Sequence, residues 1–201
     1  MNKFAFASAV ALIAGFGAAG AHAADLIIED SYVSESSTSF TGFYLEVYGG
    51  ATLPGDSTYY GTDYEMHWGP AIGVALGMQT PIEGLAVELD AMYAGAEYDC
   101  CDYGVYNASL MANAVYTVPL NDTFELYGQA GLGFVSLTYA DDYTGIGAGY
   151  NVAVGGRVSL MEGLKAFTEL KYTNTFGEVD ADGYDVGFGT LNALVGLRME
   201  F

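Results

Sequence analysis

Positive charge is scarce in this 201-residue sequence, which holds five lysines and arginines against 25 aspartates and glutamates, for a formal net charge of −20. Proteins that bind nucleic acid neutralise its phosphates with lysine and arginine, so this balance argues against a nucleic-acid partner. Proline is also scarce, with four residues, whereas glycine and tyrosine are abundant. That composition favours strands and tight turns over helices.

Histidine and cysteine, the usual metal ligands, are nearly absent. The two cysteines are adjacent, Cys100 and Cys101, and only His67 follows the first 23 residues. This spacing is not that of a zinc site, so we expect neither a metal nor a cofactor. Adjacent cysteines bridge each other only through a strained ring, or they join a second chain. We therefore expect a loop disulfide or free thiols at this position.

Long apolar runs are missing except at the start. Lys3 precedes an uncharged stretch at residues 4–18, and Ala21-His22-Ala23 matches an A-x-A cleavage site. Residues 1–23 are therefore predicted to be a signal peptide, which exports the chain. A membrane anchor is the alternative, but the run is shorter than the ~20 residues that a helical span needs. Residues 24–39, serine-rich and acidic, are predicted to form a flexible periplasmic lead-in to a domain at 40–201.

Alternation of apolar and polar residues dominates that domain. In the closing segment, Leu191–Phe201, every second residue from Leu191 is apolar, and the residues between them include Asn192, Arg198 and Glu200. A period of two is that of a strand with two different faces. Similar segments are predicted at residues 40–53, 67–79, 85–97, 104–118, 124–138, 145–160, 164–174 and 191–201. The fold class is therefore all-β, an eight-stranded antiparallel up-and-down transmembrane β-barrel.

The connections between these segments alternate between short turns and longer acidic loops. An even number of strands leaves both termini on the periplasmic side and turns the longer loops outward. We expect these loops to be a solvated acidic surface, or one that bridges divalent cations to lipopolysaccharide phosphates. Their acidic residues are Asp56, Asp63, Glu65, Asp99, Asp102, Asp141, Asp142, Asp180, Asp182 and Asp185.

Charge within the strands is confined to one face, which includes all four cations that remain after residue 23. Charges buried in a narrow barrel must pair, so this face is predicted to form a charge network across the lumen. Its members are Glu46, Glu88, Asp90, Glu125, Arg157, Lys165, Glu169, Lys171, Arg198 and Glu200.

Aromatic residues occur on both predicted faces. Eight strands enclose just enough room for side chains, so inward Tyr44, Tyr48, Tyr127 and Phe167 predict a plugged lumen and not an open pore. Outward aromatic residues are either interfacial girdles or the result of ordinary β-propensity. They are Phe43, Tyr93, Tyr116, Phe134, Tyr150 and Tyr172.

Three stretches carry a resemblance to a known family: T-G-F-Y-L-E-V-Y-G-G at residues 41–50, L-Y-G-Q-A-G-L-G at residues 126–133, and the ending R-M-E-F. From about Phe40 to Phe201 the chain resembles the OmpA-like and opacity-type eight-stranded outer-membrane barrels, including small porin-like surface proteins of alphaproteobacteria. The resemblance implies a Gram-negative cell outer membrane, with Phe201 as part of a signal read by the barrel-assembly machinery. It also implies roles in envelope stability or surface contact, although the peptidoglycan-binding domain of full-length OmpA proteins is missing and the loops are shorter than those of adhesive opacity proteins.

The leading hypothesis is thus a monomeric, non-enzymatic envelope protein whose partners are outer-membrane lipid and lipopolysaccharide. A narrow porin-like channel for small solutes is the alternative. A lipid A-modifying enzyme would use His67, but nothing in the local spacing joins His67 to Ser57 as base and nucleophile. A soluble barrel with both faces inverted is the structural rival, because alternation alone does not say which face is outside.

Overall fold

The structure is a computed structural model, and it describes residues 42–54, 57–59, 62–64, 67–97, 104–139, 143–177, 179–181, 184–186 and 189–201. All of these belong to the second of two units into which the chain divides, residues 38–201. In the described residues no helix is long and apolar enough to cross a membrane. The predicted signal peptide at 1–23 and lead-in at 24–39 lie outside the described residues.

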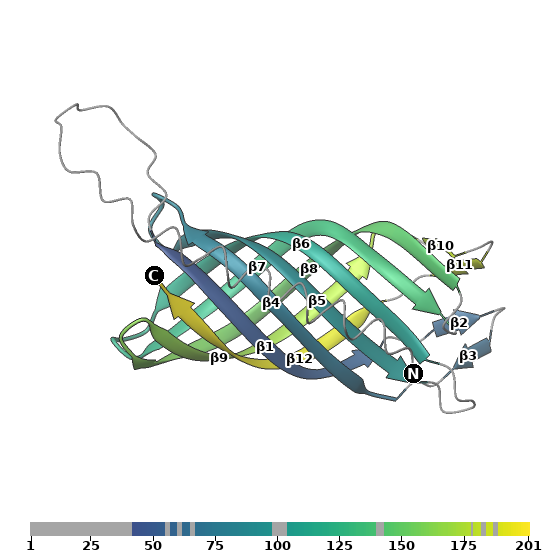
Figure 1. The fold of residues 1–201 in the computed structure, drawn as a ribbon, viewed down its shortest axis with the longest axis horizontal. Coiled ribbons are helices and arrows are strands. Elements are labelled where there is room, and N and C mark those ends of the chain that lie inside the picture. The colour runs from purple at the N-terminus through teal and green to yellow at the C-terminus, as the bar shows by residue number, and fades with distance from the viewer. Residues whose placement is uncertain are drawn as a thin grey trace. The chain divides into compact units, whose positions relative to one another are not determined.

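Eight antiparallel strands close into a barrel, in which each pairs with its neighbour in the chain and the last pairs with the first (Figure 1). This confirms the predicted fold class, and the strand ends agree with the predicted ranges to within a few residues. The barrel strands are β1 (Phe43–Pro54), β4 (Gly69–Gln79), β5 (Leu85–Glu97), β6 (Gly104–Pro119), β7 (Phe124–Tyr139), β8 (Tyr143–Met161), β9 (Leu164–Thr175) and β12 (Thr190–Glu200).

Two small hairpins occupy stretches that the sequence predicts as plain loops. One pairs β2 (Ser57–Tyr59) with β3 (Thr62–Tyr64), and the other pairs β10 (Val179–Ala181) with β11 (Tyr184–Val186). Three-residue strands are too short to produce a visible alternation, so the prediction of plain loops is wrong here. We call the end of the barrel that carries them the hairpin end. The opposite end, with the short β4–β5, β6–β7 and β8–β9 connections and Phe201, is the turn end (Figure 1).

The outer face of the barrel is apolar and the inner face is polar. Outward Leu132 and Val195 are 63% and 61% exposed, whereas inward Asn151 and Asn192 are 1% and 0% exposed. Among the strand residues whose side chains the structure describes, no outward position carries a formal charge. This is the reverse of a soluble barrel and the arrangement that lipid requires, so the inverted rival model is excluded.

Outward aromatic side chains occur toward both ends of the barrel, and outward Phe134 lies between them, opposite Leu110. Near the hairpin end, Tyr93 stacks on Tyr106 at 6.0 Å, and Tyr150 lies 5.2 Å from Phe176. Near the turn end, outward Tyr116 is 55% exposed. Tyr106 and Tyr116 both lie on β6, about ten residues apart, which corresponds to about 25 Å along the axis of a barrel with strands tilted by about 40°. That height matches the apolar band of a transmembrane barrel.

Closure of the barrel brings together the two ends of the domain. β1 and β12 pair with Glu46 directly opposite Arg198, and the N–H of Phe201 donates to the carbonyl of Phe43 at 2.8 Å. Phe201, the predicted assembly signal, is 78% exposed at the turn end. The seam therefore pairs in full to the last residue, and it places an ion pair inside the lumen.

Candidate functional site: the barrel lumen

The turn-end half of the lumen is an alternating chain of ion pairs. Glu46 Oε1 lies 3.3 Å from both the Arg157 and the Arg198 guanidinium groups, which reach it from β8 and β12. Arg198 also contacts Glu200 at 2.8 Å, and Lys165 continues the chain by contacting Glu200 at 3.1 Å. Opposite charges thus follow one another from the mouth of the barrel inward.

Exposure falls along this chain. The side chains of Lys165, Glu125 and Glu200 at the mouth are 18%, 20% and 32% exposed, and Lys165 pairs with Glu125 at 2.7 Å. The side chains of Glu46 and Arg157 deeper inside are 5% and 1% exposed. Water screens the outer pairs, whereas the inner charges depend on each other for compensation.

A second cluster surrounds Lys171 on β9. Its Nζ lies 2.5 Å from Asp90 Oδ2 and 3.1 Å from Glu169 Oε1, so one cation serves two carboxylates. Both carboxylates accept a further hydrogen bond from a phenol: Tyr48 donates to Asp90, and Tyr127 donates to Glu169 at 2.8 Å. These contacts tie four strands, β1, β5, β7 and β9, together across the lumen.

Glu88 is held differently, by neutral donors. Its Oε2 accepts from the Tyr44 hydroxyl at 3.0 Å, and its Oε1 accepts from Asn113 Nδ2 at 2.9 Å. The excess of carboxylates over cations predicted from the sequence is therefore met here by a phenol and an amide.

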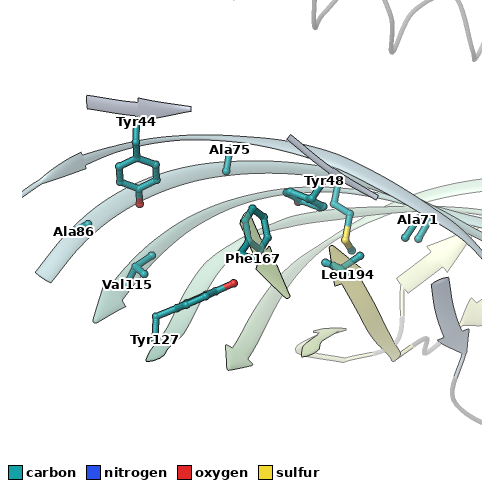
Figure 2. Packing of buried hydrophobic residues seen from close by; sticks show 11 residues of the cluster. Tyr44, Tyr48, Ala71, Ala75, Ala86, Val115, Tyr127, Phe167 and Leu194 are labelled. Carbon is teal, nitrogen blue, oxygen red and sulfur yellow. The ribbon is translucent and has the colours of Figure 1, made fainter. Parts of the chain in front are cut away.

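Aromatic rings fill the space between the ion pairs. Phe167 lies between Tyr48 and Tyr127, with ring centroids 6.3 and 6.5 Å away and edge-to-face geometry (Figure 2). The Arg157 guanidinium lies 3.7 Å from the centroid of the Tyr127 ring, which adds a cation–π contact. The rings and ion pairs thus form one packed layer across the lumen.

Two glycines on β4 make room for the rings of Tyr44 and Tyr48 on the neighbouring strand β1. A Cβ atom at Gly73 would overlap the ring of Tyr48, and one at Gly77 would overlap the ring of Tyr44. The pairing explains why these glycines share the inward phase of β4. Ring and glycine together occupy the volume that two medium side chains would occupy.

Beyond Asp90 and Lys171 toward the hairpin end, the described lumen side chains carry no formal charge. An apolar cluster joins Val105, Met111, Val135 and Leu137 to Val179 of the β10–β11 hairpin, which packs against the barrel. Buried polar side chains without formal charge lie there and between the charged groups: Thr52, Asn107, Ser109, Asn113, Gln129, Asn151, Thr173, Thr175, Thr190 and Asn192. The two ends of the lumen thus have different chemistry.

Every residue of the predicted charge network points into the lumen, and each one contacts at least one other ionised or hydrogen-bonding side chain there. Cys100 and Cys101 lie outside the described residues, as do the side chains of the ten acidic loop positions. His67 is exposed ahead of β4. In the described part of the chain, no group of three or more His, Cys, Asp or Glu side chains is placed to hold a metal ion.

Sequence reasoning missed the inward amides, chiefly Asn113, Gln129 and Asn151. Their signal was present, because each is a polar residue at an inward position in the middle of a strand. The predicted network was built on formal charge alone, so these residues received no role in it.

Comparison with known proteins identifies the family. Residues 8–198 match the model of the outer membrane protein beta-barrel domain. The chain belongs to this family. Membership places it in the outer membrane and agrees with the apolar outer face described above. No curated protein matches the chain by sequence.

Solved outer-membrane barrels share the fold. Neisserial surface protein A is 17% identical, with a TM-score of 0.58, and the match covers 80% of this chain and 99% of that one. A major outer membrane protein from Thermus thermophilus is 16% identical, with a TM-score of 0.50, over 79% and 99% of the two chains. Ail, the attachment invasion locus protein of Yersinia pestis, is 14% identical, with a TM-score of 0.48, over 80% and 97%. At these identities, the likeness to the first two structures shows the barrel fold alone.

Proposed function

We propose that this family member is a non-enzymatic envelope protein whose packed barrel is itself the functional object. The observation that carries the proposal is the burial of the middle of the lumen. Val115, Asp90 and Lys171 are 0%, 1% and 2% exposed although they face the axis of the barrel. In an open channel, groups at these positions would be accessible to water.

Conductance in a planar lipid bilayer tests the plugged lumen. The wild-type protein is expected to give no steady single-sized channel. A double variant, Tyr48→Ala with Phe167→Ala, removes two rings of the packed layer and is expected to show conducting openings, which verifies that inserted protein is detected. A steady channel from the wild-type protein would establish the alternative, a narrow porin-like pathway for small solutes.

Membrane residence is tested by electrophoresis in SDS with and without boiling. A folded transmembrane barrel keeps its tertiary structure in cold SDS, so the outer-membrane fraction should give a band that shifts on heating. A band in the soluble periplasmic fraction with no shift would contradict the proposal.

The enzymatic alternative rests on His67. We expect His67→Ala to leave the mass spectrum of lipid A unchanged in cells that express the protein, because nothing in the local sequence spacing joins His67 to Ser57 as base and nucleophile. An altered lipid A spectrum that depends on His67 would establish an enzyme instead.

Recognition of Phe201 by the barrel-assembly machinery is the remaining part of the proposal. Its ring is exposed at the turn end, and its backbone already pairs with β1. Phe201→Ala is therefore expected to reduce the amount of heat-shifting barrel in cells while leaving refolding into detergent micelles intact. An equal loss in both settings would assign Phe201 to stability and not to recognition.

A further inference from the structure

A shallow apolar groove of about 550 Å³ crosses three neighbouring strands on the outer face of the barrel, β6, β7 and β8. Its floor consists of residues with little or no side chain: Ala114 and Ala130, which lie opposite each other, and Gly128. Larger outward side chains form its walls: Tyr116, Leu126, Val152 and Val154. We call this feature the β7 groove.

Two details of the packing leave the floor of the β7 groove uncovered. Tyr116 lies directly opposite Gly128, yet its ring packs over the β4–β5 turn, where it would come within 3.3 Å of a Cβ atom at Gly84. A Cβ atom at Gly128 itself would meet nothing closer than the carbonyl oxygen of Ala153, at 3.8 Å. The described side chains therefore leave the groove open to whatever surrounds the barrel.

The groove opens into the hydrocarbon of the membrane, because family membership places the barrel in the outer membrane. Phe124 begins β7 at the turn end, and Ala130 follows it on the same strand. With strands tilted by about 40°, this spacing places the groove within roughly 15 Å of the turn end. A bilayer core is about 30 Å thick, so the groove lies within one leaflet.

We propose that the β7 groove holds one acyl chain of a phospholipid in the turn-end leaflet. A hydrocarbon chain is narrow enough to enter between Leu126 and Val154, and there it gains dispersion contacts with both the floor and the walls. The lipid is a phospholipid and not lipopolysaccharide, because the loops at the hairpin end face the cell surface. The proposal rests on membrane residence and this orientation, and it is independent of the plugged lumen.

A second copy of the chain is the rival occupant, and the size of the groove argues against it. Eight outward residues line the groove, whereas a stable protein interface takes roughly 20–30 residues from each partner. The convex wall of another barrel would also meet the protruding side chains of Leu126 and Val154 before it reached Gly128. The β7 groove therefore fits a single acyl chain better than a protein surface.

An NMR titration of the detergent-solubilised protein with palmitoyl-oleoyl phosphatidylcholine tests the proposal. This head group is zwitterionic, so the net negative charge of the protein does not repel it. The methyl resonances of Ala114 and Ala130 should shift and saturate at one phospholipid per barrel. Ala193, exposed on the outer face of β12 and outside the groove, is the matched control and should shift without saturation. Equal, unsaturated shifts at all three methyl groups would overturn the proposal, because they indicate ordinary boundary lipid.

Native mass spectrometry of the protein extracted from phosphatidylcholine vesicles counts the phospholipid that stays bound. Wild type and the control Ala193→Leu should each retain one molecule, whereas Ala130→Leu fills the groove and should bind it roughly tenfold more weakly. Equal retention by both variants would overturn the proposal, as would a dimer that Ala130→Leu abolishes or a preference for lipopolysaccharide.

A heat-shifting band in cold SDS establishes that each protein is a folded barrel, so loss of the site is distinguished from loss of membrane residence. If Ala130→Leu does not fold, the titration of the wild-type protein decides the question alone.

Discussion

The two halves of the lumen solve the same packing problem in different ways. At the turn end, charged side chains from five strands compensate one another, and Glu46 alone holds two arginines. At the hairpin end, the side chains are neutral and several of their polar atoms have no partner in the protein. Of the unpartnered buried atoms in the described residues, only Arg157 Nε belongs to a charged side chain. The comparison shows that one half is closed by the chain's own charges, whereas the other is closed by neutral side chains.

The largest effect should come from removing the shared carboxylate of the turn-end half. Glu46→Leu leaves Arg157 buried without its counterion and leaves Arg198 with Glu200 alone, so the free energy of unfolding should fall by roughly 3–5 kcal/mol. Urea titration of the protein in lipid vesicles measures this loss, and the heat-shifting band reports how much protein remains folded. A loss below about 1 kcal/mol would mean that water compensates these arginines, and the contrast between the two halves would then disappear.

A smaller effect should come from overfilling the ring layer. Gly77→Ala places a methyl group against the Tyr44 ring, so we expect a loss of about 1–3 kcal/mol in the same titration. Gly128→Ala is the matched control, because its methyl group faces outward into open space. Similar losses in both variants would assign the effect to strand backbone instead of packing in the lumen.

Because water screens the partly exposed ion pairs at the mouth of the turn-end half, removing one should cost less unfolding free energy. Glu125→Gln removes one partner of Lys165, but Lys165 keeps Glu200 and both mouth side chains are partly exposed. The loss of unfolding free energy should stay below about 1 kcal/mol and should shrink further in high salt. A loss as large as that of Glu46→Leu would show that the stability these ion pairs contribute does not depend on their burial.

The smallest change is expected in the hairpin-end half. Thr52 on β1 is 1% exposed, and its hydroxyl has no hydrogen-bond partner. Thr52→Val removes that hydroxyl and keeps the shape, so stability should stay within about 0.5 kcal/mol of wild type or rise. A clear loss would reveal a hydrogen-bond partner of the Thr52 hydroxyl.

The sequence was sufficient for the strands and their faces, because a period of two assigns each residue to one side of a barrel wall. It placed Glu46 and Arg198 inward, for instance, and lipid-facing Leu132 outward. It was not sufficient for the pairing of charges, since alternation says nothing of height along the axis. Which carboxylate Arg157 meets depends on the strand stagger that closure imposes.

The short hairpins and the amides were missed for other reasons. A three-residue strand such as β10 contains barely one period, so Val179 could not be recognised as a lumen residue. The role of Asn113 comes from its contact with Glu88, and that contact depends on the register between β5 and β6, which alternation does not set.

The ion pair between Glu46 and Arg198 joins residues 152 positions apart. The edge of β1 that pairs with β12 therefore remains unpaired until nearly all of the chain has crossed the inner membrane and the periplasm. An unpaired edge is a template for aggregation, and the eleven residues of β12 cover it. The barrel therefore closes only when β12, its last strand, has reached β1.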